Sequence, residues 1–158
     1  MAELLLVDND PRIVELIAWF LTKRGHSVRT AASFAAAREL IRERAPDLML
    51  SDIDLGLEHG RDELPALARA GMLPPTLVVS GYLDRELARL FATMPSIVGV
   101  VAKPVGMVEL EARIQACLDV SRKADATPHV APLAPLPARA GNPSAGDPSA
   151  RPGGERAL

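Results

Sequence analysis

The chain has 158 residues, of which 48% are apolar and 24% charged, a composition typical of a soluble globular protein. Its net charge of −2 gives no bulk attraction to nucleic acid or to an acidic membrane surface. A single cysteine excludes an internal disulfide, and the sequence has no run of about 20 apolar residues for membrane insertion. The first residues lack the basic and apolar regions of a signal peptide, so we expect a cytoplasmic protein.

Five short apolar runs predict β-strands. They lie at Leu4–Val7, Val28–Thr30, Leu48–Ser51, Thr76–Val79 and Ile97–Ala102. Four of them, all but the second, are almost continuous in apolar residues. Continuous apolar runs of this length are typical of parallel strands that are covered on both faces of a sheet.

A helical pattern of apolar residues follows each of these runs. The five patterns consist of Ile13, Ile17, Phe20 and Leu21; Phe34, Ala37, Leu40 and Ile41; Leu64, Leu67 and Ala68; Leu87, Leu90, Phe91 and Met94; and Leu110, Ile114, Cys117 and Leu118. Gly25 is expected to end the first helix, and Ser33 is expected to be the N-cap of the second. Cys117 belongs to the fifth pattern and is expected in the core. The alternation of strand and helix predicts an α/β fold with a parallel sheet and helices on both of its faces.

The composition changes near Lys123. Residues 124–158 contain seven of the 14 prolines, four of the 11 glycines and nine alanines, with few large apolar side chains. Such a segment cannot bury enough surface to offset the entropy lost on ordering. We therefore expect a domain over residues 1–122 and a disordered tail with polyproline character over residues 123–158. A short proline-rich docking motif is the alternative to a passive extension.

Polar side chains stand at the ends of four predicted strands. The first strand is followed by Asp8, Asn9 and Asp10, the third by Asp52 and then Asp54, the fourth by Ser80, and the fifth is followed by Lys103. In open α/β sheets, ligands bind beyond the carboxyl ends of the strands. If these four strands are neighbours, we expect their acids, amide, hydroxyl and amine to converge on one edge of the sheet.

This set of side chains predicts phosphoryl chemistry. Two like charges about 4 Å apart repel by about 4 kcal/mol at an effective dielectric constant of about 20. A hard divalent cation such as Mg²⁺ or Mn²⁺ would offset the repulsion between the acids, and Lys103 adds a further positive charge. A carboxylate held beside a metal, an amine and a hydroxyl can attack phosphorus and form an aspartyl phosphate.

Several of these residues also have a simpler explanation when each is taken alone. Asp10 before Pro11 is a good helix start, with proline at the first helical position. Asp54 and Gly56 fit a turn, and Ser80 precedes a glycine in an ordinary turn pair. The functional interpretation therefore depends on the residues occurring together, in order, at successive strand ends.

The chain resembles the receiver domain of two-component response regulators. The matching segments are LLLVDNDP (Leu4–Pro11), LMLSDIDLG around Asp52, LVVSGY at Ser80 and VVAKPV at Lys103, and the resemblance covers Met1 to about Arg122. It implies a flavodoxin-like, doubly wound sheet of five parallel strands in the order 2-1-3-4-5, with five helices. Because no helix-turn-helix or basic effector domain follows Lys123 in this sequence, we expect a stand-alone response regulator without a DNA-binding output domain.

The resemblance implies a role for three of the matching residues in phosphoryl transfer. Asp52 would accept a phosphoryl group from a phosphohistidine on a sensor histidine kinase or a histidine phosphotransfer protein. Ser80 would bond one phosphoryl oxygen and shift toward it, while Lys103 would pair with another. The peptide bond before Pro104 would be cis. The signal would pass to an unknown output protein by phosphorylation-dependent contact, or onward by phosphotransfer.

The resemblance also implies a site for Mg²⁺ or Mn²⁺. Asp8, Asn9, Asp52 and the backbone carbonyl of Asp54 would hold the metal, and Asp10 would contribute through water. The family usually has a second acid where this chain has Asn9. Because an amide oxygen brings no charge, we expect weaker metal binding but not its loss.

Two further positions depart from the family pattern. Many receivers have a tyrosine or phenylalanine about three residues before the lysine, and this chain has Val100 there. Tyr82, two residues after Ser80, does not match that position. The loop IDLGLEHGRDELP after Asp52 also lacks the Met-Pro pair that is common in the family.

Three other classes of protein share some of these sequence features. A receiver-fold binding module that is never phosphorylated would explain Asn9 and Val100. The D-x-D pattern of Asp52 and Asp54 also resembles the haloacid-dehalogenase-like phosphohydrolases, but in those proteins it usually follows the first strand of the domain, whereas here it follows the third. A nucleotide-binding Rossmann fold is excluded because no glycine-rich loop follows the first strand. We therefore expect a phosphoacceptor and not an enzyme.

Overall fold

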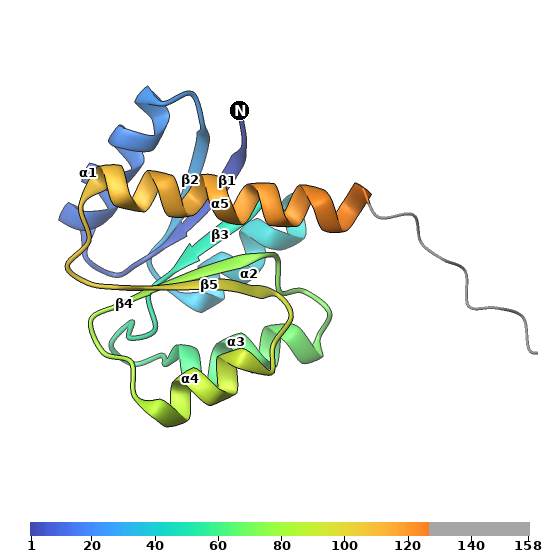
Figure 1. Cartoon of the computed structure of the whole chain (residues 1–158). Coiled ribbons are helices and arrows are strands. Elements are labelled where there is room, and N and C mark those ends of the chain that lie inside the picture. The colour runs from blue at the N-terminus through green and yellow to red at the C-terminus, as the bar shows by residue number, and fades with distance from the viewer. Residues whose placement is uncertain (127–158) are drawn as a thin grey trace, which may run out of the picture. The chain divides into compact units, whose positions relative to one another are not determined.

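The computed structural model describes residues 1–126, in which strands and helices alternate along the chain (Figure 1). The strands are β1 (Glu3–Val7), β2 (Ser27–Ala31), β3 (Leu48–Ser51), β4 (Thr76–Ser80) and β5 (Ile97–Ala102), and the helices are α1 (Pro11–Lys23), α2 (Phe34–Glu43), α3 (Gly60–Arg69), α4 (Arg85–Ala92) and α5 (Met107–Ala126). Every strand and the helices α1 to α4 agree with a predicted strand or helical pattern to within a few residues at their ends, whereas α5 extends eight residues past Leu118, the last residue of its predicted pattern.

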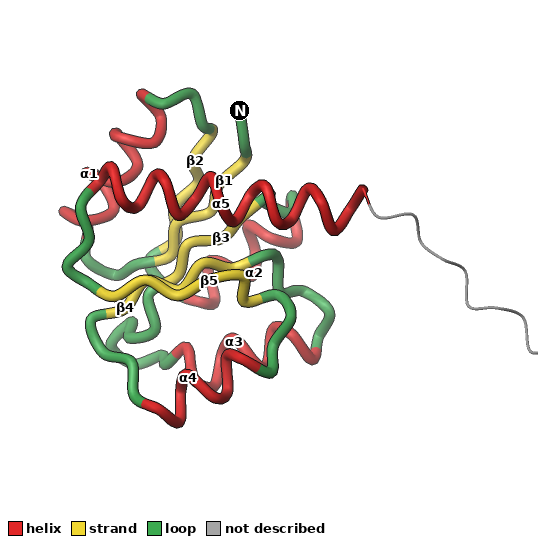
Figure 2. Tube along the Cα trace, viewed as in Figure 1, coloured by secondary structure: helices red, strands yellow, loops and turns green. Residues whose placement is uncertain are grey.

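All five strands run parallel, in the order β2-β1-β3-β4-β5, which confirms the predicted fold class. Helices α1 and α5 cover one face of the sheet, while α2, α3 and α4 cover the other (Figure 2). The chain starts at β1, moves outward to β2 and then returns past β1 to β3. The order therefore reverses between β1 and β3, which is where ligands bind in sheets of this kind.

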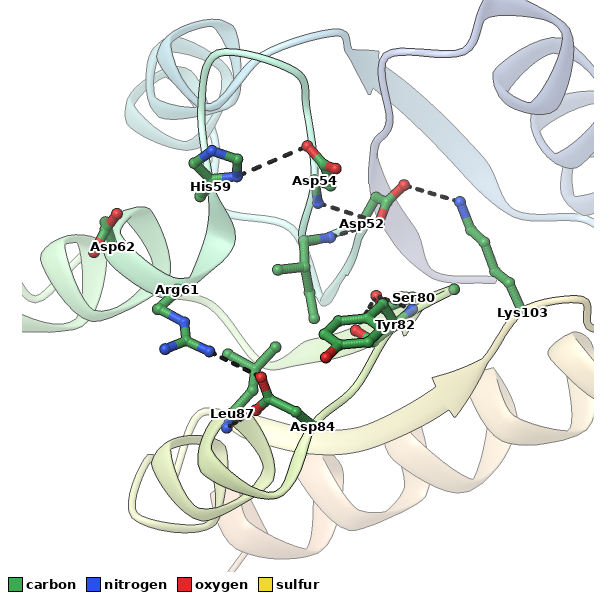
Figure 3. Close-up of a pocket in the computed structure, with 12 residues that line it drawn as sticks. Asp52, Asp54, His59, Arg61, Asp62, Ser80, Tyr82, Asp84, Leu87 and Lys103 are labelled. Atoms are coloured by element: carbon green, nitrogen blue, oxygen red, sulfur yellow. Dashed lines mark hydrogen bonds and ion pairs between the residues drawn. The ribbon is translucent and has the colours of Figure 1, made fainter.

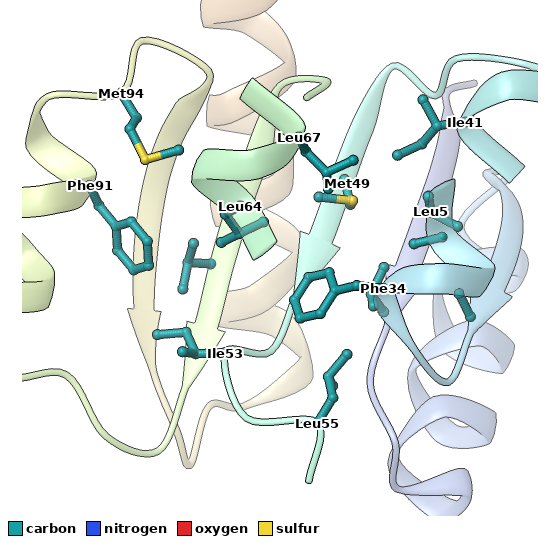
Figure 4. Packing of buried hydrophobic residues seen from close by; sticks show 14 of the residues in the cluster. Leu5, Phe34, Ile41, Met49, Ile53, Leu55, Leu64, Leu67, Phe91 and Met94 are labelled. Carbon is teal, nitrogen blue, oxygen red and sulfur yellow. The ribbon is translucent and has the colours of Figure 1, made fainter. Parts of the chain in front are cut away.

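The core consists of two apolar clusters, one on each face of the sheet. Because neighbouring residues of a strand point to opposite faces, Leu5 and Val7 belong to one cluster, and Leu4 and Leu6 to the other. Figure 4 shows the first cluster, in which the fully buried Phe34 of α2 lies among side chains of the sheet and of α3. Cys117 is buried in the second cluster, as predicted.

The ends of the helices follow the signals in the sequence. Asp10 accepts a hydrogen bond from the Arg12 backbone N–H at 3.0 Å, and Pro11 is the first residue of α1. Ser33 accepts a bond from Ala36 N–H and caps α2. Gly25 has a φ of 91°, a conformation that favours glycine and ends the chain's first helical segment.

Two predicted boundaries differ from the structure. Helix α4 ends at Ala92, so Met94 is buried but lies beyond the helix; Pro95 disfavours the helical conformation at the residue before it. Helix α5 continues to Ala126, four residues past the predicted domain end at Arg122, because lysine and alanine favour helix and no proline occurs between Pro104 and Pro128. The remaining predicted tail, residues 127–158, lies outside the described residues.

Candidate functional site

Four of the predicted site residues meet at the carboxyl edge of the sheet. The hydrogen-bond pattern of the sheet continues one residue past three of the strands: Asp8 N–H donates to Ala31 O at 3.1 Å, Asp52 N–H to Val7 O at 3.0 Å, and Lys103 N–H to Ser80 O at 2.8 Å. These bonds fix the backbones from which the side chains of the candidate site project. Figure 3 shows Asp52, Ser80 and Lys103 on their neighbouring strands.

Lys103 joins the two central carboxylates. Its Nζ donates to Asp8 Oδ2 at 3.0 Å and to Asp52 Oδ2 at 2.9 Å. The Asp8 side chain is 5% exposed, Asp52 14% and Lys103 24%. Charges that are buried to this extent require partners, which this arrangement supplies. The peptide bond between Lys103 and Pro104 is cis, as predicted.

The charge of Lys103 is set by opposing effects. Burial alone would lower the pKa of its ammonium group, because loss of water disfavours the charged form. Hydrogen bonds and charge attraction from Asp52 and Asp8 outweigh burial and raise the pKa of Lys103 above its ordinary value. Lys103 is therefore protonated at neutral pH and compensates one of the two carboxylates.

The second oxygen of each carboxylate is held by the backbone. Asp8 Oδ1 accepts a hydrogen bond from Asp10 N–H at 2.9 Å. Asp52 Oδ1 accepts one from Ile53 N–H at 2.6 Å and a longer one from Asp54 N–H at 3.4 Å. Each carboxylate is thus held between a backbone amide and the lysine, which fixes the direction of both side chains.

The Ser80 hydroxyl forms a local turn with Tyr82. Ser80 Oγ donates to Tyr82 O at 2.9 Å and accepts from Tyr82 N–H at 3.2 Å. The Ser80 residue is 5% exposed, whereas Tyr82 is 75% exposed. Val100, at the position of the expected aromatic residue, packs against the buried cluster under α4. The hydroxyl therefore lies at the site but is bonded to its own loop.

The carboxylates of Asp10 and Asp54 are engaged away from the centre of the site. Asp10 caps α1, and its hydrogen bond from the Arg12 backbone is the largest cause that lowers the pKa of its carboxyl group. The Asp54 side chain is 75% exposed, accepts from Gly56 N–H at 3.1 Å and lies 3.8 Å from His59 Nδ1. The structure thus supports the turn interpretation of Asp54, and only its backbone carbonyl is a candidate ligand.

The oxygen atoms that remain available at the site fit a hard cation that takes few ligands from the protein. Asp8 and Asp52 supply two carboxylates, and a Cβ built on Gly56 would lie 3.7 Å from Asn9 Nδ2, so the Asn9 amide lies beside the loop after Asp52. Within residues 1–126, no three His, Cys, Asp or Glu side chains form a cluster able to hold a metal ion. Two carboxylates with amide and carbonyl oxygens match the way Mg²⁺ is bound through one or two carboxylates.

A pocket of 590 Å³ opens from Asp52 toward α3 and α4. Its far wall contains Arg61, Tyr82 and Asp84 (Figure 3). Sequence reasoning missed Arg61 and Asp84. An aspartate before an apolar helical pattern could have identified Asp84 as an N-cap, but no local signal pairs it with an arginine 23 residues earlier in the chain.

Comparison with known proteins identifies the family. The sequence model of the response regulator receiver domain matches residues 4–115, so the chain belongs to this family. The transcriptional regulatory protein KdpE of Mycobacterium tuberculosis is 32% identical over 118 residues, which cover 75% of this chain and 51% of KdpE. AfsQ1 of Streptomyces coelicolor is 33% identical over 118 residues, 75% of this chain and 52% of AfsQ1. The chain thus spans about half the length of these relatives.

A solved structure supports the fold. The CheY-like response regulator receiver domain protein of Methanospirillum hungatei JF-1 matches with a TM-score of 0.72 over 78% of this chain and 98% of that protein, at 24% identity. Receiver domains are phosphoacceptors that typically bind Mg²⁺ at the phosphorylation site. The family assignment excludes the haloacid-dehalogenase-like interpretation. No helix within residues 1–126 is long and apolar enough to cross a membrane.

Proposed function

We propose that Asp52 is the phosphoacceptor of a response regulator. The observation that carries this proposal is the ammonium group of Lys103, held between Asp8 and Asp52 at the point where the strand order reverses. An oxygen of Asp52 attacks the phosphorus of a phosphohistidine. The new O–P bond forms as the P–N bond breaks, and the electron pair of that bond returns to the imidazole nitrogen.

Three groups of this chain prepare the reaction. Lys103, now bonded to Asp52, pairs with a phosphoryl oxygen and offsets its charge. The Ser80 hydroxyl donates to another oxygen after leaving Tyr82. Asp8, Asn9, Asp52 and the Asp54 carbonyl would hold Mg²⁺ or Mn²⁺, which when bound neutralises charge on the transferred group.

The proposed phosphodonor is a sensor histidine kinase or a histidine phosphotransfer protein in the cytoplasm. The receiver family and the exposed mouth of the Asp52 pocket support a macromolecular donor. The output is contact with a partner protein that favours the phosphorylated arrangement, or onward phosphotransfer. KdpE and AfsQ1 are named as transcriptional regulatory proteins, whereas we propose no nucleic acid contact for the residues described here.

Intact mass spectrometry after incubation with acetyl phosphate and Mg²⁺ tests the proposal. We expect the wild-type protein to gain one phosphoryl group and Asp52→Asn to gain none. Asp62→Asn is a matched control, because Asp62 lines the same pocket and the substitution is chemically identical. Equal labelling of wild type and Asp52→Asn would show that another residue is the acceptor.

Asn9 favours a second candidate function, a receiver-fold binding module that is not phosphorylated. In that case neither Mg²⁺ binding nor a gain of mass would be detected in the wild type. Asn9→Asp would then restore both if the missing acid is the cause. Phosphorylation of the wild-type chain would exclude this second function.

A further inference from the structure

Arg61 connects two helices across the mouth of the Asp52 pocket (Figure 3). It is the second residue of α3, and its Nη2 donates to Asp84 Oδ2 at 3.2 Å while its Nη1 donates to Glu86 Oε2 at 3.1 Å. Asp84 is the N-cap of α4, and Glu86 lies in the first turn of that helix. The guanidinium group therefore ties the start of α3 to the start of α4.

Asp84 has two roles at the end of the segment that begins at Ser80. Its Oδ1 accepts from Leu87 N–H at 2.7 Å and caps α4, while its Oδ2 receives the bond from Arg61. At the other end, Ser80 Oγ bonds both backbone groups of Tyr82. Residues 81–84 are thus restrained by Ser80 at one end and by Arg61, through Asp84, at the other.

The Ser80 restraint conflicts with phosphorylation. A serine hydroxyl has a single proton to donate, and here that proton goes to the Tyr82 carbonyl. Donation to a phosphoryl oxygen requires Ser80 to release Tyr82. The Arg61–Asp84 contact then resists any movement of residues 81–84 that follows. Because β5 has Val100 where many receivers have an aromatic ring, no ring on β5 moves together with residues 81–84. The Arg61–Asp84 contact therefore has a larger effect on the position of this segment.

We propose that Arg61 is a positioning residue that holds residues 81–84 where Ser80 is bonded to Tyr82, and so opposes phosphorylation of Asp52. This inference rests on the proposed function. The Arg61 side chain is 43% exposed and Asp84 33%, and such ion pairs are weak. We therefore expect the Arg61–Asp84 contact to shift the equilibrium between the arrangement with Ser80 bonded to Tyr82 and the arrangement with Ser80 released by about two- to fivefold. A phosphoryl group on Asp52 can overcome a shift of this size.

The test compares the affinity of wild type and Arg61→Met for beryllofluoride, a phosphoryl analogue, in the presence of Mg²⁺. We expect the variant to bind about two- to fivefold more tightly. Glu86→Gln should shift the affinity less in the same direction, because the bond to Asp84 remains. Salt at about 1 M should remove the difference, since it screens exposed charges over about 3 Å. Arg42→Met is the matched control, because Arg42 pairs with Glu39 within α2, outside the pocket.

Two readouts separate positioning from a general effect on the fold. In a Ser80→Ala background, Arg61→Met should leave the affinity for the analogue unchanged. Arg61 acts by holding residues 81–84 where Ser80 is bonded to Tyr82, and that bond is absent in Ser80→Ala. Hydrogen exchange of residues 81–87 should be faster in Arg61→Met than in Arg42→Met. Equal or weaker analogue binding by Arg61→Met, with normal binding by wild type, would overturn this inference alone. Failure of the wild type to bind the analogue or accept a phosphoryl group would overturn the Asp52 assignment as well.

Discussion

Substitution of Lys103 by methionine should expose the repulsion between Asp8 and Asp52. The Oδ2 atoms of both carboxylates lie within 3.0 Å of Lys103 Nζ, so they are at most about 6 Å apart. At an effective dielectric constant of about 20, two unit charges at about 6 Å repel by about 3 kcal/mol. Methionine keeps the apolar stem of the side chain and removes the ammonium group. In the wild type the ammonium group offsets this repulsion by attracting both carboxylates, and the substitution removes that attraction. We therefore expect the free energy of unfolding to fall by about 3 kcal/mol, the lower end for loss of one buried partner.

Urea denaturation followed by circular dichroism at neutral pH measures this effect. The double variant Lys103→Met/Asp8→Asn should recover most of the lost stability, because a single carboxylate then remains and asparagine can still accept from Asp10 N–H. Lys23→Met is the control, since Lys23 is exposed at the end of α1, and its change should stay within about 1 kcal/mol.

The reasoning is refuted if Lys103→Met is as stable as wild type. It is also refuted if the double variant is no more stable than the single one, because the loss would then come from packing and not from charge. Either result would remove the main electrostatic argument for a site built around Asp52.

Three further predictions follow from individual contacts. Asn9→Asp should tighten Mg²⁺ binding measured by calorimetry, because it adds a negative ligand; an unchanged affinity would place Asn9 outside the metal's ligands. Gly60→Ala should lower the free energy of unfolding by about 1–3 kcal/mol in urea titrations, because a Cβ there would lie 3.0 Å from Ile53 Cα; an unchanged value would show that the loop adapts. His26 is buried, and burial lowers its pKa, so the unfolded chain binds the proton more readily. Stability from neutral His26 should be complete above its ordinary pKa of 6.5 and decline as the pH falls toward the lowered folded value; His26→Gln should remove that part of the slope.

The fold could be predicted because local and global signals agree. Apolar runs such as Leu48–Ser51 are typical of strands covered on both faces, and the helical patterns that alternate with them are typical of crossover helices. The same patterns do not locate the C-terminal ends of α4 and α5. Met94 continues the apolar spacing of α4 although the helix has already ended, because burial and helical conformation are separate properties.

The site was predictable where it depends on topology. Asp8, Asp52 and Lys103 could be placed together because each follows a strand, and parallel strands end at one edge of the sheet. The contact between Arg61 and Asp84 could not be predicted in this way. Both residues lie at helix starts, where the direction of a long side chain depends on the packing of α3 against α4 and not on strand order.

The charge balance of the site gives Asn9 its importance. Asp8, Asp52 and Lys103 together carry a net charge of −1, whereas an acid at position 9 would make it −2. To a first approximation, the Coulomb attraction for a divalent cation is therefore halved in this chain. The cation must also compete with an ammonium group that lies 2.9 Å from Asp52. We therefore expect phosphorylation of Asp52 to require higher Mg²⁺ concentrations in the wild type than in the Asn9→Asp variant. At every Mg²⁺ concentration below saturation, Lys103 should then offset a larger share of the negative charge at the site in the wild type than in the variant.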